Sequence, residues 1–173
     1  IFATPKPRKK ISRAFPKRTC RLIPPFSHPE GAAIGDLRLF AFVPGRKIDP
    51  VYYALAITWN DEAVVLAPHG FTFRPAQLHF LESYRIRLLA TTFTLVALPA
   101  LLGGHVNPGP EKARQLVRQL RPQYVVNTHD EPKHARGLIM RLARTEYPDL
   151  EGIDFNENAR LMQIDHYDPV TLE

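Results

Sequence analysis

Residues 124–131 read YVVNTHDE, and this stretch decides the fold expected for the chain. Its first three residues favour a strand, and the strand leads directly into His129 and two carboxylates. The preceding segment, Pro110 to Leu120, carries apolar residues at the i, i+3, i+4 and i+7 spacing of an amphipathic helix. Ligands and catalytic groups of α/β proteins gather at the carboxyl ends of strands. The pattern predicts a helix, a buried strand, and then a histidine suited to bind a metal or move a proton.

The same construction occurs earlier in the chain. Residues 63–67 read AVVLA, a strand-forming run, and Pro68, His69 and Gly70 follow it. Gly70 allows the backbone to turn sharply after the strand. Two histidines at two strand ends can converge on one site, although a single histidine in such a place is more often a hydrogen-bonded hinge residue.

The order of the predicted elements indicates an α/β domain. We expect a mixed sheet with helices on one face, because a strand hairpin is followed by alternating helices and strands. The predicted strands are residues 36–43, 51–59, 63–67, 87–94, 124–128 and 159–164, with a three-residue hairpin loop at 60–62 and a long loop at 99–110. The predicted helices are residues 75–84, 110–120 and 134–145. Residues 1–31 are rich in proline and are expected to be extended, with little room for a helix.

Composition is that of an ordinary globular protein. The 173 residues are 45% hydrophobic and 23% charged, enough for one domain with a sizeable core. The sequence has no apolar run of membrane-spanning length, so we expect no membrane span. Cys20 is the only cysteine, which excludes an internal disulfide and a cysteine-based zinc cluster. A reducing, cytoplasmic compartment is the simplest expectation.

Positive charge is concentrated at the N-terminus. Residues 1–22 contain eight lysines and arginines and no acid, which exceeds the net charge of +6 for the whole chain. Such a segment is either a solvated basic extension or an arm for nucleic acid or an anionic membrane. Only Phe2 and Phe15 flank the run, so it lacks the interleaved aromatic residues of single-strand binders. We expect a basic extension over residues 1–31 and one domain over 32–173.

Several enzyme classes are disfavoured by missing motifs. The sequence contains neither GxGxxG nor GxxxxGK[ST], which dinucleotide and nucleotide triphosphate sites require. Serine is scarce near the histidines, which disfavours a Ser-His-Asp hydrolase.

Three motifs together resemble a known superfamily. They are APHG at residues 67–70, LLGGHVNPG at 101–109 and NTHDE at 127–131. Over residues 36–143 they are similar to the C-terminal half of a metallo-β-lactamase-fold protein of the lactonase-like or phosphodiesterase-like branch. The resemblance implies an αββα sandwich of two similar halves with a zinc site along one edge. It places His69 in the slot of the bridging ligand and His129 in that of the last histidine, with Asp130 able to orient the ring or accept a proton.

The sequence departs from the superfamily pattern in two ways. The HxHxDH motif, which supplies the main ligands from the N-terminal half, is absent. Because the chain begins with Ile1 and not methionine, we expect those ligands in a missing N-terminal half. That half is therefore an expected partner of this chain. His69 also stands where a carboxylate is usual, and an imidazole does not bridge two metals as a carboxylate does. One zinc ion, bound weakly or not at all by this chain alone, is therefore expected.

Three functions remain open from the sequence. The first is a metal-dependent hydrolase of a small-molecule ester, lactone or phosphodiester, incomplete in this chain. The second is a non-catalytic scaffold or binding protein that keeps the fold without the metal. The third is a nucleic-acid binder that uses the basic N-terminal segment.

Overall fold

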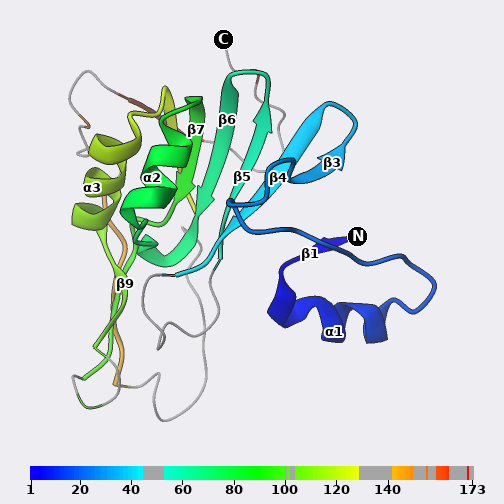
Figure 1. The fold of residues 1–173 in the computed structure, drawn as a ribbon. Coiled ribbons are helices and arrows are strands. Elements are labelled where there is room, and N and C mark those ends of the chain that lie inside the picture. The colour runs from blue at the N-terminus through cyan, green and yellow to red at the C-terminus, as the bar shows by residue number, and fades with distance from the viewer. Residues whose placement is uncertain are drawn as a thin grey trace.

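A seven-stranded mixed sheet forms the centre of the molecule (Figure 1). The computed structural model describes residues 1–44, 53–99, 101, 104–128, 142–149, 155, 159–163 and 171. The strands are β1 (Phe2–Ala3), β2 (Arg21–Leu22), β3 (Ala32–Ile34), β4 (Leu37–Phe42), β5 (Ala54–Trp59), β6 (Glu62–Ala67), β7 (Arg85–Thr91), β8 (Leu95–Ala97), β9 (His105–Pro108), β10 (Tyr124–Asn127), β11 (Arg144–Glu146) and β12 (Arg160–Met162). The helices are α1 (Pro5–Ala14), the 3₁₀ turn η1 (Pro68–Gly70), α2 (Pro75–Leu81) and α3 (Pro110–Leu120).

The central sheet has an antiparallel half and a parallel half. Its strand order is β12-β10-β7-β6-β5-β4-β3. Neighbours from β3 to β6 are antiparallel, whereas β6, β7, β10 and β12 run parallel to one another. The parallel half brings the carboxyl ends of β6, β7 and β10 to one edge, which is where ligands of α/β sheets bind.

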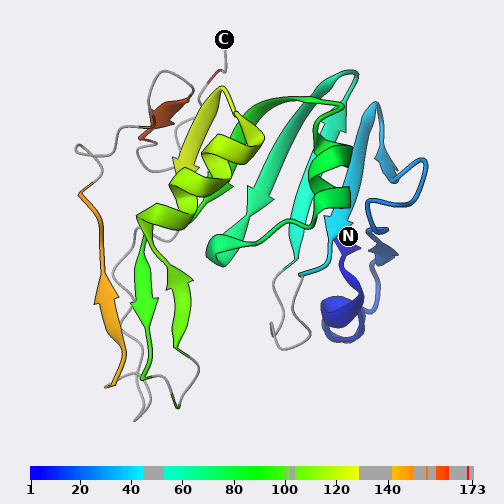
Figure 2. The ribbon, with the colours of Figure 1, turned by 60° about the vertical axis from the view of Figure 1, so that its left-hand side comes forward.

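Helices α2 and α3 cover one face of this sheet (Figures 1 and 2). The apolar residues of α3, which are Ala113, Leu116, Val117 and Leu120, are buried as their helical spacing predicts. They pack with Val65, Leu89 and Val125, which the alternation of the strands presents to the same face. The prediction of a mixed sheet with helices on one face is confirmed.

The opposite face of the sheet is also apolar, and no described helix covers it. We define the open face by seven aliphatic residues on five adjacent strands, each of them half-buried: Leu39, Leu55, Ile57, Val64, Leu66, Leu88 and Val126. The strand registers line them up in two rows, Leu39–Ile57–Val64–Leu88 and Leu55–Leu66–Ala90–Val126. A sheet that is apolar on both faces is typical of a layer buried between two others.

A second, three-stranded sheet of order β11-β8-β9 extends from the end of β7. It is a feature that the sequence patterns did not predict, because residues 99–110 read as a loop and contain β9. Residues 144 and 145 lie in strand β11 and not in the predicted helix 134–145. The first eight positions of that predicted helix, 134–141, lie outside the described residues. Short strands with glycine and proline nearby give too little periodicity to be recognised.

The prediction that residues 1–31 are extended, with little room for a helix, was wrong. Residues 5–14 form helix α1, where an extended segment was expected. Both prolines of this helix, Pro5 and Pro7, fall in its first turn, where the missing N–H costs nothing. The hairpin loop between β5 and β6 is also shorter than expected, because Trp59 pairs with Glu62 and leaves two loop residues. Within the described residues, no helix is long and apolar enough to cross a bilayer.

Candidate functional site

His69 lies at the carboxyl end of β6, in the short turn η1. Its backbone is left-handed, with φ 54° and ψ 34°, and Gly70 has φ 63°. A left-handed conformation costs a residue other than glycine about 1–2 kcal/mol. Two consecutive left-handed residues turn the chain sharply at the edge of the sheet. Strained backbone conformations cluster at functional sites, so the left-handed backbone of His69 is consistent with a functional role for its imidazole.

The ring of His69 is held by Asn107. Nδ1 of His69 lies 2.6 Å from Oδ1 of Asn107. The amide oxygen can only accept, so Nδ1–H donates and Nε2 carries the lone pair. Asn107 is 6% exposed and belongs to β9, so the second sheet places it. This part-buried contact is similar to the hydrogen bonds that fix the tautomer and direction of metal-ligating histidine rings.

Hydrogen bonds join the ends of the three parallel strands. Oγ1 of Thr91 donates to the carbonyl of Ala67 at 2.8 Å, which ties β7 to the end of β6. The amide of Thr128 donates to the carbonyl of Thr91 at 2.7 Å, which ties the chain after β10 to β7. Oδ1 of Asn127 accepts from the amide of Phe93 at 3.0 Å. These three hydrogen bonds therefore connect the carboxyl ends of β6, β7 and β10 at the edge that carries His69.

Two buried hydroxyl groups lie at this edge. Thr92 and Thr128 directly follow Thr91 and Asn127, which are partners in the parallel register of β7 and β10. Oγ1 of each is buried and has no hydrogen-bond partner among the residues that the structure describes. A buried hydroxyl without a partner costs about 1–3 kcal/mol, so this edge is suited to a polar ligand.

Of the three residues predicted for the site, the structure describes only His69. His69 lies at the predicted edge. His129 and Asp130 lie outside the described residues, which in this segment end at Thr128. Strand β10 pairs with β7, which pairs with β6, so the described part of this segment ends at the edge that carries His69. Asn107 lies in the motif at residues 101–109, but its contact with His69 joins residues 38 positions apart, so the sequence gives no signal for it.

The described residues contain no group of three or more histidines, cysteines or carboxylates that could hold a metal. Within these residues, His69 is therefore a single candidate ligand. The exposed His79 lies on α2, where Nδ1 is 3.1 Å from Oε2 of Glu82. The exposed His28 accepts from the amide of Glu30 at 3.3 Å. Neither residue lies at the carboxyl edge of the parallel strands.

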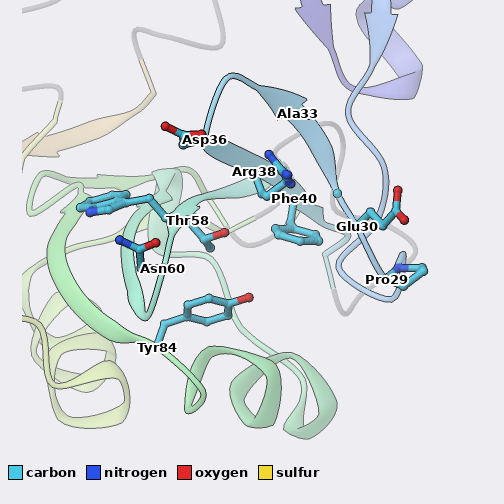
Figure 3. Close-up of a pocket in the computed structure, with 11 residues that line it drawn as sticks. Pro29, Glu30, Ala33, Asp36, Arg38, Phe40, Thr58, Asn60 and Tyr84 are labelled. Carbon is cyan, nitrogen blue, oxygen red and sulfur yellow. The ribbon is translucent and has the colours of Figure 1, made fainter.

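A separate groove of about 580 Å³ lies at the other end of the sheet, around the turn between β5 and β6 (Figure 3). Arg38, Thr58, Asn60 and Tyr84 contribute polar groups to it, and Phe40 lines its inner part. None of its described lining residues is a histidine or a cysteine. The groove therefore does not belong to the edge that His69 occupies.

Comparison with known proteins finds a distant structural similarity. No protein-family model matches the sequence, and no curated protein matches it. Among solved structures, the chain is similar to a Thermotoga maritima protein assigned to the Zn-dependent hydrolases of the metallo-β-lactamase superfamily, with a TM-score of 0.44 and 17% identity. The alignment covers 68% of this chain and 53% of that one, so this chain spans about half the length of that protein. At this similarity, the function has to be argued from the residues themselves.

Proposed function

We propose that the chain carries the C-terminal part of the metal site of a metallo-β-lactamase-type hydrolase. His69 and His129 are the proposed ligands, and Asp130 is the proposed group that orients a ring or accepts a proton. The contact between His69 and Asn107 is the observation that supports this most strongly, because it fixes the ring with Nε2 as the nitrogen that carries the lone pair. The substrate class is a small-molecule ester, lactone or phosphodiester.

The residues at the edge fit this role in part. His69 is a nitrogen donor of the kind that zinc prefers, held in one tautomer. A bound zinc ion supplies hydroxide at neutral pH, since it lowers the pKa of its water to about 7. The protein's own part is to direct the His69 ring and to offer the hydroxyls of Thr92 and Thr128 at the same edge. The remaining ligands have to come from residues beyond the described set.

We further propose that the open face packs against a second layer that supplies those ligands. The seven aliphatic residues of this face are half-buried, while those of the opposite face are covered by α2 and α3. Exposed apolar patches beyond a few hundred Å² usually mark an interaction surface. The partner is an N-terminal half with its own sheet, which would complete the αββα sandwich.

The isolated chain is expected to bind Zn²⁺ weakly, because zinc sites in proteins use three or four ligands and only two are proposed here. Calorimetric titration of residues 1–173 should show this, and His69→Asn should remove the binding. Asparagine tolerates the left-handed backbone of position 69 but lacks the imidazole. The matched control is His79→Asn, at an exposed position on α2, which should leave the titration unchanged.

Two outcomes would contradict this reading. Stoichiometric, tight zinc in the purified chain would mean that the site is complete without a second half. A titration that does not respond to His69→Asn would favour the alternative of a scaffold or binding protein that retains the fold without the metal.

The open face is expected to bind a hydrophobic dye in the isolated chain. Val64→Lys and Leu66→Lys, singly, should reduce the dye fluorescence, because each puts a charge among half-buried aliphatic residues. Arg118→Lys on the exposed surface of α3 is the control. Native protein that unfolds cooperatively and binds no dye would count against a missing layer.

A further inference from the structure

The first 22 residues fold into a small unit of their own. Strands β1 and β2 pair in parallel on either side of α1. The amide of Arg21 donates to the carbonyl of Ile1 at 2.8 Å, and the N-terminal ammonium donates to the carbonyl of Thr19 at 2.9 Å. A bridge between Pro25 and Ala41 joins the following chain to β4. The unit lies near β3 and β4, at the opposite end of the sheet from α3 (Figures 1 and 2).

The unit has a strongly positive surface. Its basic residues other than Lys6, whose side chain is not described, are all exposed: Arg8, Lys9, Lys10, Arg13, Lys17, Arg18 and Arg21. No ion pair between these side chains and a carboxylate occurs within the part of the chain that the structure describes. A shallow groove of about 550 Å³ is lined by Arg8, Lys9, Ser12, Arg13 and Leu22. The surface therefore attracts an anionic partner.

Large apolar side chains are exposed among these charges. Phe15 is 54% exposed at the end of α1, Ile1 is 45% exposed, and Leu22 is 40% exposed. Leu22 also lines the basic groove, so one apolar side chain shares this groove with Arg8 and Arg13. A surface that combines basic residues with exposed phenylalanine and aliphatic side chains is typical of proteins that lie on a bilayer.

We propose that this basic surface, residues 1–22, docks on an acidic lipid bilayer. The lysines and arginines meet the anionic headgroups, while Phe15, Ile1 and Leu22 enter the boundary between headgroups and acyl chains. Nucleic acid is the weaker fit. Residues 1–22 contain no Asn or Gln to pair with adenine edges, and their aromatic side chains for stacking on bases are limited to two phenylalanines.

The expected effect of charge removal follows from the headgroup attraction. Each lysine or arginine near an acidic surface strengthens binding by a factor of about 5. Removing three of them should therefore weaken binding by about 100-fold. Raising the salt concentration from about 0.1 M to about 1 M shortens the Debye length from about 10 Å to about 3 Å and should release most of the protein.

The test is co-sedimentation of the full chain with vesicles. We expect binding to vesicles that contain phosphatidylserine and little binding to pure phosphatidylcholine. Arg8→Gln, Lys9→Gln and Arg13→Gln together should lose about 100-fold in affinity, and Phe15→Ser should lose affinity at unchanged charge. The control removes the same charge from α3 through Lys112→Gln, Arg114→Gln and Arg118→Gln, and should bind as the native chain does. Circular dichroism checks that each variant is folded.

Three results would overturn the proposal: equal binding to neutral and acidic vesicles, binding that survives the triple change in α1, or no binding to either vesicle. Filter binding to single-stranded polyuridine is the competing assay. Polyuridine that binds through the same three residues while acidic vesicles do not would replace the bilayer with nucleic acid as the partner.

Discussion

Phe42→Ala is expected to lower the free energy of unfolding by about 3–5 kcal/mol, the range for truncating a fully buried aromatic residue. Phe42 is 0% exposed on the helix-covered face of β4. Its ring lies 5.6 Å from that of Phe26, 5.4 Å from that of Phe73 and 5.9 Å from that of Phe80. Phe73 lies in the segment before α2, Phe80 in α2 and Phe26 in the segment before β3. Removing the Phe42 ring would therefore leave a cavity between the sheet and these segments.

Urea denaturation followed by circular dichroism measures this loss. Phe15→Ala is the matched control, since the ring is 54% exposed and its removal should change the free energy of unfolding by less than about 0.5 kcal/mol. A loss below about 1 kcal/mol for Phe42→Ala would mean that the aromatic cluster is not the centre of the core.

When this chain is joined to the proposed N-terminal half, His129→Ala is expected to reduce the proposed hydrolysis to background while the fold stays intact. It removes a proposed metal ligand, and the buried residues of β10 lie before it in the chain. Asn107→Ala should have a graded effect, about 10–100-fold on metal affinity or activity, because it removes the support of His69 and not a ligand.

The control for this series is His79→Ala, whose side chain is 88% exposed beside Glu82. It should leave activity unchanged. Folded His129→Ala protein with full activity would refute the proposed role of this residue, and equal effects of His79→Ala and Asn107→Ala would refute the role of Asn107.

The sequence predicts an element correctly where one hydrophobic period, that of a helix or a strand, runs through a long segment. Helix α3 begins at Pro110 and ends at Leu120 as its spacing predicts, because four apolar residues on one face are decided by burial against the sheet. The strand-forming runs at residues 51–59 and 63–67 likewise predicted the hairpin that carries the chain to His69, which the structure forms over Ala54–Trp59 and Glu62–Ala67. The position of His69 at a strand end followed from these elements.

The rest depends on contacts that no local pattern contains. Helix α1 is not evident from the sequence, because prolines usually break helices and both of its prolines are tolerated only since they lie in the first turn. Strands β8 and β9 are three and four residues long and are decided by their pairing with each other. Asn107 gains its role only when β9 brings it to His69, so its spacing in the sequence gives no signal. What lies at residue 129 remains a prediction.

A crystal structure of the chain grown with Zn²⁺ tests the central claim most directly. If His69 and His129 share one ion, the anomalous signal of zinc should lie about 2 Å from a ring nitrogen of each. The two nitrogens should then be roughly 3 to 4 Å apart, with Asn107 still holding Nδ1 of His69. Rings on opposite edges of the domain, well over about 10 Å apart and beyond the reach of any shared metal, would contradict the account.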